Sequence, residues 1–301
     1  MRRPLSPILR LLAAGAFGVL LIVIVTRRAW REEAPASRPA SHPPHVTEPR
    51  APAPPGRPRP DARAPAAKTP APPTRMLRAP GEPARAAIIM DDLGNSLEPL
   101  QELCALGAKV TASILPFAAE TRPSAEAAKA CGLEVMLHLP LESLTPPART
   151  PTGTISSGMS GEEVRADILA CIEQVPGCRG VNNHAGSKAT EDTVLMPEIL
   201  GVLRSKGLYF IDSRTTSATV AYETARALGV PAAERNVFLD VVLEDGAIKS
   251  RIEELFRIAR DAGRAVGICH PKPETLAALR KYLGLAPAYG VTLVFASEIV
   301  D

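Results

Sequence analysis

From residue 86 onward the chain alternates short apolar runs with longer segments of helical spacing. Strands that alternate with helices form parallel βαβ units. About eight such runs in one domain favour a closed or nearly closed β/α barrel over an open doubly wound sheet. The predicted strands span residues 86–90, 110–115, 133–137, 180–182, 208–211, 237–239, 265–269 and 291–295, and the clearest predicted helices span 161–175, 194–206, 217–228 and 248–262.

The first 85 residues have a different character. An uncharged apolar run at 11–25 has arginines on both sides, and it is short beside the roughly 20 residues that cross a bilayer. Arginines directly after the run favour an uncleaved signal-anchor, residues 1–33, over a cleaved signal peptide. Residues 34–85 hold 16 of the 31 prolines, which predicts a disordered linker. These segments predict a single-pass inner-membrane protein with domain 86–301 in the periplasm, although charge on both flanks leaves the orientation open.

The charge distribution limits the classes of partner. Residues 1–85 carry 15 Lys and Arg against 5 Asp and Glu, whereas residues 86–301 carry 20 against 27. An acidic domain without interleaved aromatic and basic residues argues against nucleic-acid binding. The absence of a glycine-rich dinucleotide fingerprint and of a P-loop argues against Rossmann-type and NTPase functions. The oligomeric state is not predicted.

The five cysteines are an odd number and form no CxxC pair. Such spacing indicates neither a zinc knuckle nor a disulfide framework. We interpret most of them as small buried residues. A bridge between Cys171 and Cys178 is the one pairing considered, in an oxidising compartment.

Polar residues suited to metal binding or proton transfer follow six of the predicted strands. In parallel β/α folds the carboxyl ends of the strands gather on one face, where active sites are built. A single such residue is commonly structural, and we interpret Asp240 as a helix cap. Six on one rim predict a functional site. The residues are Asp91, Asp92, His138, Glu142, Asn183, His184, Asp212, Ser213, Arg214, Asp240 and His270.

These residue types point to hydrolysis at a metal. A catalytic zinc or similar ion takes about three protein ligands and leaves a position for water, whose pKa it lowers. Asp91 and Asp92 cannot easily point the same way, so one is expected to bind the ion while the other orients or deprotonates the water. His270 suits a general acid that protonates a leaving amine. Arg214 is expected to hold either Asp212 or a carboxylate of the substrate.

Five motifs together resemble the divergent polysaccharide deacetylase family over essentially all of residues 86–301. They are Asp91-Asp92 after an apolar strand, Gly132 to His138-Leu-Pro-Leu-Glu142, Val181-Asn-Asn-His-Ala-Gly-Ser187, Phe210-Ile-Asp-Ser-Arg-Thr215 and Gly267-Ile-Cys-His-Pro271. The family is similar to carbohydrate esterases of the chitooligosaccharide-deacetylase type. The resemblance implies a distorted (β/α)7 barrel with a divalent metal, usually zinc. It implies Asp91 as the base, Asp92 and His138 as metal ligands, and His270 as the catalytic histidine.

The chain departs from that family pattern at the third metal ligand. Similar deacetylases carry two metal histidines at positions i and i+4, but here His138 is followed by Glu142 at i+4. Either Glu142 supplies the third ligand or His184 from the next strand replaces it. We prefer His184, because the apolar Leu139-Pro140-Leu141 path gives the loop a different shape.

The leading hypothesis is a metal-dependent hydrolase that removes acyl groups from amides. Its expected substrate is an N-acetylated envelope polysaccharide or another N-acylated compound. Asn183, Asp212, Ser213 and Arg214 are the predicted substrate-binding residues. The alternative is a weakly active or inactive tethered envelope binding or assembly protein that keeps the metal-binding barrel. A metal phosphoesterase is a third possibility, which the acidic domain disfavours.

Overall fold

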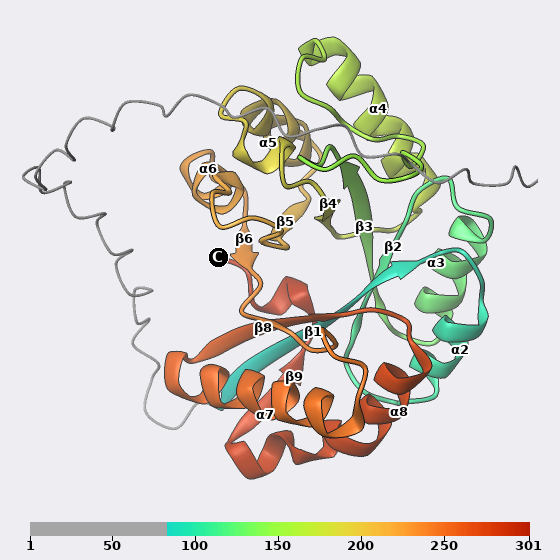
Figure 1. Ribbon diagram of the computed structural model, residues 1–301, viewed down its shortest axis with the longest axis vertical. Helices are drawn as coiled ribbons and strands as arrows, with labels where there is room; N and C mark the ends of the chain where they lie inside the picture. The colour runs from blue at the N-terminus through green and yellow to red at the C-terminus, as the bar shows by residue number, and fades with distance from the viewer. Residues whose placement is uncertain (1–82) are drawn as a thin grey trace, which may run out of the picture. The chain divides into compact units, whose positions relative to one another are not determined.

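The computed structural model describes residues 83–301. In this part of the chain strands and helices alternate, and every strand pairing is parallel (Figure 1). The strand order is β6-β5-β4-β3-β2-β1-β8-β7, and β9 also pairs with β1. The strands are β1 (Ala84–Leu93), β2 (Thr111–Ile114), β3 (Glu134–Leu141), β4 (Gly180–Ala185), β5 (Tyr209–Asp212), β6 (Ala232–Glu234), β7 (Val237–Phe238), β8 (Arg264–Cys269) and β9 (Val291–Val294).

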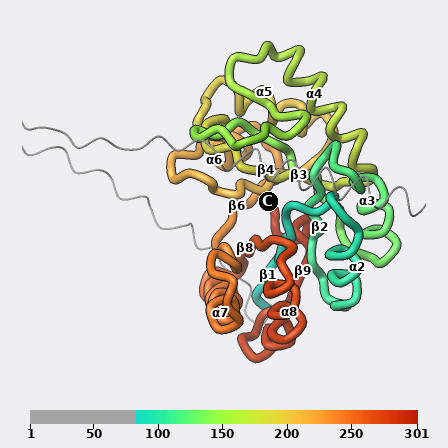
Figure 2. The backbone as a smooth tube through the Cα atoms, turned by 45° about the vertical axis from the view of Figure 1, so that its right-hand side comes forward, coloured from blue at the N-terminus to red at the C-terminus, as the bar shows by residue number. Residues whose placement is uncertain are grey.

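The helices lie around the outside of the sheet (Figures 1 and 2). Strands β6 and β7 end the hydrogen-bonded path, and among the described residues no pairing joins them. The sheet is therefore a curled, incompletely closed barrel, which confirms the predicted distorted β/α barrel. The helices are α2 (Glu98–Cys104), α3 (Thr121–Ala130), α4 (Gly161–Gln174), α5 (Leu195–Ser205), α6 (Ala221–Ala227), α7 (Asp245–Ala262) and α8 (Pro273–Tyr282), with 3-10 turns η1 (Ala189–Glu191), η2 (Leu283–Tyr289) and η3 (Ala296–Glu298).

All eight predicted strands are present, and β6 was not predicted. Three strands run further than their apolar patterns indicate: β1, β3 and β4 continue past the polar residues that were expected to end them. The predicted anchor and all but the last three residues of the predicted linker lie outside the described residues. Within residues 83–301, no helix combines the length and apolar character that crossing a bilayer requires.

Strand alternation separates two hydrophobic cores. Successive side chains of a strand point to opposite faces of the sheet. In β1, Ile88 and Met90 join the large core beneath the helices, whereas Ala87 and Ile89 join a smaller core inside the curled sheet. The other strand residues of the inner core share this inward register, and Ala296 and Ile299 after β9 complete the core. The strand residues are Met136, Tyr209, Ile211, Ala233, Val266, Ile268 and Val294.

The same register explains which polar residues face the interior. Continuing each strand by two residues places Asp91 beyond Ile89 and His138 beyond Met136. At the opposite, amino end of the sheet the inward residue is Glu134, whose carboxylate accepts hydrogen bonds from Tyr209 at 2.7 Å and Thr111 at 3.2 Å. The barrel interior is thus apolar in the middle and polar at both ends, with the histidines and aspartates at the carboxyl end.

The interpretation of the cysteines as mostly unbridged holds for three of the five, but it missed one disulfide. Cys104 and Cys131, at the carboxyl ends of α2 and α3, form a disulfide, while Cys171 and Cys178 are free. Cys104 is the last residue of α2 and Cys131 directly follows α3, and these two helices pack side by side on the outside of the sheet (Figure 1). Sequence spacing did not indicate this pair because 27 positions separate the two cysteines and only the packing of α2 against α3 brings them together.

Candidate metal centre

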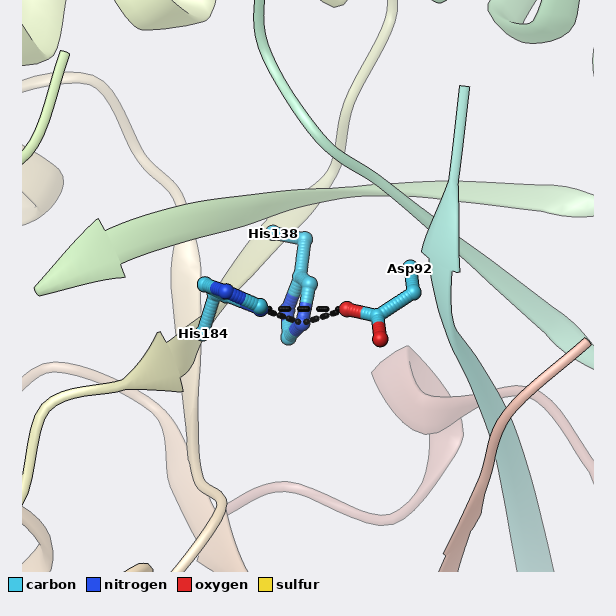
Figure 3. Close-up of side chains that lie close together, drawn as sticks. All are labelled: Asp92, His138 and His184. Atoms are coloured by element: carbon cyan, nitrogen blue, oxygen red, sulfur yellow. Dashed lines mark hydrogen bonds and ion pairs between the residues drawn. The ribbon is translucent and has the colours of Figure 1, made fainter. Parts of the chain in front are cut away.

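Three side chains from three strands converge at the carboxyl end of the barrel (Figure 3). Asp92 Oδ1 lies 3.0 Å from His184 Nδ1 and 3.2 Å from His138 Nε2. The two histidine nitrogens are 3.1 Å apart. Asp92, His138 and His184, the three predicted metal ligands, are therefore brought together, although their sequence separations exceed 40 positions.

An irregular stretch of β1 allows both adjacent aspartates to reach this point. The register between β1 and β2 shifts between Met90 and Leu93, and Asp92 has a φ of 57°. A bulge with a left-handed residue turns the next side chain back toward the same face. Asp92 therefore joins Asp91, which faces inward by regular alternation and whose Oδ2 lies 3.7 Å from His138 Nε2. The expectation that neighbouring aspartates diverge holds for a regular strand, and the bulge removes that constraint.

The donor set fits a small divalent cation. Ligand bonds of about 2.0–2.1 Å in a tetrahedral site place donor atoms roughly 3.3 Å apart, and the three separations here are 3.0, 3.1 and 3.2 Å. The side chains of Asp92 and His184 are 36% and 29% exposed, whereas His138 is 3% exposed. The buried histidine anchors the site from below, and the exposed side leaves space for water or substrate.

Charge interactions prepare the site for a cation. Burial opposes ionisation of Asp92, but hydrogen bonds from both histidines outweigh burial and lower its pKa. Burial likewise opposes protonation of His138, but the nearby carboxylates, Asp91 first, raise its pKa. Burial raises the pKa of Asp91 itself. The cluster thus sets one readily ionised carboxylate, Asp92, against two imidazole nitrogens in a partly desolvated place, a donor combination that binds divalent ions.

A second pair of side chains lies at the end of the neighbouring strand β8. His270 directly follows β8, whose last register partner on β1 is Met90, so His270 emerges beside Asp91. Its Nδ1 lies 3.1 Å from Asp240 Oδ1, and this hydrogen bond raises the pKa of His270. Asp240 Oδ2 accepts from the His270 backbone N–H at 2.6 Å and from the Thr275 hydroxyl at 3.0 Å. Asp240 therefore orients His270, a contact that its interpretation as a helix cap missed.

The predicted substrate-binding residues are mostly engaged within the protein. Asn183 Oδ1 accepts from the Ser213 backbone N–H, and Asp212 accepts from the Thr219 hydroxyl, each at 2.8 Å. Arg214 Nη1 lies 2.5 Å from Glu234 Oε2, so its side chain does not pair with Asp212, one of its two expected partners; contact with a substrate carboxylate stays a prediction. All four residues lie at the ends of β4 and β5, and their contact with a substrate stays a prediction.

Glu142, the alternative third ligand, does not belong to the cluster. Its carboxylate lies 2.9 Å from Lys188 Nζ and accepts a 2.9 Å hydrogen bond from the Ser157 backbone. Strand β3 extends to Leu141 with Pro140 inside it, and this extended path carries Glu142 beyond the site. Of the two candidates, the structure brings His184 to Asp92 and His138.

Asn182 is a site residue that the sequence does not single out. It is fully buried on β4 and contacts both Asp91 and His138. The one signal for it in the described residues is side-chain alternation along β4. Asn182 lies two positions from both Gly180 and His184, so the three residues face the same, inward side of the strand. Asn183, one position further, has the opposite orientation.

Comparisons with known proteins agree with this geometry. The model of the family described as divergent polysaccharide deacetylase matches residues 88–300. An uncharacterized protein of Haemophilus influenzae is 31% identical over 68% of this chain and 72% of its own length. The protein YibQ of Escherichia coli is 31% identical over 75% of this chain and 70% of its own length.

One solved structure shows the same fold. The uncharacterized protein ATU2773 from Agrobacterium tumefaciens superposes with a TM-score of 0.69 at 23% identity, covering 73% of this chain and 91% of that protein. The likeness at this identity concerns the fold. The match of the family model to most of the chain, with both curated relatives above 30% identity, shows that the chain belongs to the divergent polysaccharide deacetylase family.

Proposed function

We propose that the chain is a metal-dependent hydrolase of amide C–N bonds that removes N-acetyl groups from an envelope polysaccharide. The observation that carries the proposal is the convergence of Asp92, His138 and His184 on one point beside a buried second carboxylate, Asp91. Family membership supports the substrate class. The mixed nitrogen and oxygen donors support zinc as the ion.

Each residue has a defined task in this proposal. Asp92, His138 and His184 would hold the ion, which when bound polarises an acyl carbonyl and makes water more acidic. Asp91 accepts the proton of the attacking water, a role that suits a carboxylate whose pKa burial has raised. His270, protonated and held by Asp240, donates a proton to the leaving amine nitrogen. The products are a carboxylic acid and a free amine, and the two proton transfers balance.

The disulfide supports the proposed periplasmic location. Disulfides persist in oxidising compartments and are rare in the cytosol. The bridge between Cys104 and Cys131 lies within the barrel domain. It agrees with the predicted inner-membrane anchor at residues 1–33, which would leave domain 86–301 outside the cytoplasm. Labelling of free thiols in protein from whole cells, with and without prior reduction, tests this location.

The activity is tested with the full chain purified in mild detergent. The protein is stripped with a chelator, reloaded with zinc, cobalt or manganese, and assayed for acetate release from N-acetylglucosamine oligomers and peptidoglycan. We expect metal-dependent release that Asp91→Asn abolishes. Glu142→Gln makes the matched carboxylate-to-amide change on the same rim, and we expect it to leave turnover nearly unchanged. Metal-independent release, or full activity in Asp91→Asn, would refute the proposal.

A second candidate function is a tethered envelope binding protein without turnover. Its supporting observation is that the large exposed apolar side chains of the described residues all lie on loops after the carboxyl ends of β2, β3, β4 and β7, the end that carries the candidate site. A catalytically silent wild type whose Asp91→Asn variant still complements a deletion strain would favour this candidate. The side chains are Phe117, Leu144, Val194, Val241, Val242 and Leu243.

A further inference from the structure

Asn182 lies between the proposed base and one of the proposed metal ligands. It is fully buried in β4, directly opposite His138 in the register with β3. Its Oδ1 lies 2.9 Å from His138 Nδ1 and accepts a 2.7 Å hydrogen bond from the Ser113 hydroxyl. Its Nδ2 donates to Asp91 Oδ1 at 2.8 Å and to the Ser213 hydroxyl at 3.3 Å.

These four contacts use the whole hydrogen-bonding capacity of one amide. An asparagine side chain has two N–H donors and an oxygen that accepts two bonds. Asn182 Nδ2 donates to Asp91 Oδ1, so the NH2 group faces this carboxyl group. The Asn182 oxygen must then face His138 Nδ1. A flipped amide would place oxygen against carboxylate, which costs the full penalty of two unpaired buried polar groups.

The orientation of the amide determines the tautomer of His138. Because Asn182 Oδ1 accepts, His138 Nδ1 must carry a proton. The lone pair of the neutral ring is then on Nε2, the atom that lies 3.2 Å from Asp92 Oδ1 and 3.1 Å from His184 Nδ1. The nitrogen facing the other two donors is thus the one able to bind a cation. Partners of this kind tune metal sites in general.

We infer that Asn182 is a positioning residue that holds His138 in its metal-binding tautomer and holds Asp91 beside it. The inference rests on the proposed function, since it concerns the ion held by Asp92, His138 and His184. It adds to that function that one buried amide has two roles: it fixes the tautomer of His138 and it holds Asp91 in place. Asn182 itself contacts neither the ion nor the substrate.

Two substitutions separate this role from a merely structural one. Asn182→Leu keeps the branched shape of the side chain but removes the acceptor for His138 and the donor for Asp91. Asn182→Asp keeps an oxygen toward His138 and sets its other oxygen against Asp91 Oδ1, so the two carboxyl groups are expected to share one proton. Tyr209→Phe serves as the control, because it removes one buried hydrogen bond to Glu134 at the opposite end of the sheet. Its expected loss of stability is about 1 kcal/mol.

Zinc and cobalt affinities of the full-length variants are measured by competition with a chromophoric chelator. We expect Asn182→Leu to bind roughly 10–100-fold more weakly than the wild type. We expect Asn182→Asp and Tyr209→Phe to bind almost as tightly as the wild type. In the zinc-loaded wild type labelled with 15N-histidine, long-range 1H–15N spectra should show a proton on His138 Nδ1 and none on Nε2.

The outcomes distinguish this inference from the proposed function. If the wild type retains no divalent ion, the proposed function fails together with the inference. If the wild type binds zinc and Asn182→Leu binds it equally well, the inference alone fails. Weakening of Asn182→Asp to the level of Asn182→Leu, or an unprotonated His138 Nδ1 in the wild type, would also overturn the inference.

Discussion

Replacement of Asp240 by asparagine tests how Asp240 orients His270, the proposed general acid, and favours its protonated form. Asp240 makes three hydrogen bonds: to His270 Nδ1, to the His270 backbone N–H and to the Thr275 hydroxyl. The single oxygen of an asparagine would remain with the backbone and hydroxyl donors. Its NH2 group would then face His270 Nδ1, which must become an acceptor. The protonated imidazole of His270 loses the oxygen that accepts its Nδ1 hydrogen bond, so the neutral form is favoured.

The size of the effect follows from these contacts. Loss of a positioned general acid lowers turnover by about 10²–10⁴-fold. Loss of one charge-assisted hydrogen bond costs about 1–2 kcal/mol of stability, allowing for the partial exposure of His270. The folded-state pKa of His270 is raised above its ordinary value of 6.5. The stabilisation by its protonated form is therefore complete below pH 6.5 and disappears as the pH rises through the raised folded pKa.

Three measurements on Asp240→Asn examine this reasoning. The pH profile of acetate release should lose activity at a lower pH than in the wild type. NMR titration should show a lower pKa for His270. Urea unfolding at about pH 5.5 and about pH 9 should show a larger difference from the wild type at the acidic pH. Thr275→Val, which removes an Asp240 contact without touching His270, is the control. An unchanged His270 pKa, or equal rates in both proteins, would refute the assignment of Asp240 as the orienting residue.

Three further outcomes are expected. Zinc at about 100 times its dissociation constant should stabilise the wild type against unfolding by about 2.7 kcal/mol and should not stabilise His184→Ala; calorimetry with and without chelator measures this, and equal shifts would exclude His184 as a ligand. Cys104→Ser should destabilise the domain by about 3–4 kcal/mol, because the disulfide closes a loop of 27 residues; an unchanged Tm under non-reducing conditions would contradict it. Gly180→Ala should destabilise by about 1–3 kcal/mol or more, because its added β-carbon would lie 2.3 Å from the Tyr209 ring, and Tyr209→Ala in the same protein should relieve that clash.

The sequence indicated the barrel because its strands are strongly apolar and its helices have regular spacing. Strand β6 was not predicted because it has only three residues, Ala232–Glu234, of which two are alanines. It is a strand because β5 offers a free edge beside it, a tertiary effect that no local pattern contains. The disulfide was not predicted for a similar reason, because Cys104 and Cys131 are brought together only by the packing of two helices.

For the candidate site, the sequence indicated which residue types take part and that they lie at the carboxyl ends of the strands. Histidines and aspartates that follow strands indicated the candidate site, and the Leu139-Pro140-Leu141 path favoured His184 over Glu142. The bulge at Asp92 was not predictable, because it depends on the register between β1 and β2. The choice between Asn182 and its neighbour required the inward register of β4, which a pair of adjacent asparagines does not reveal.

The left-handed backbone at Asp92 restricts how this position can change over time. Most side chains at such a φ cost about 1–2 kcal/mol, whereas asparagine and glycine tolerate it. Asparagine therefore removes the carboxylate with little harm to the barrel. A lineage that abandons the reaction is expected to keep a sound scaffold with asparagine here. An Asp92→Asn change would remove a proposed metal ligand and leave almost no trace in the architecture, so the residue at this position is one marker of which relatives keep the proposed site.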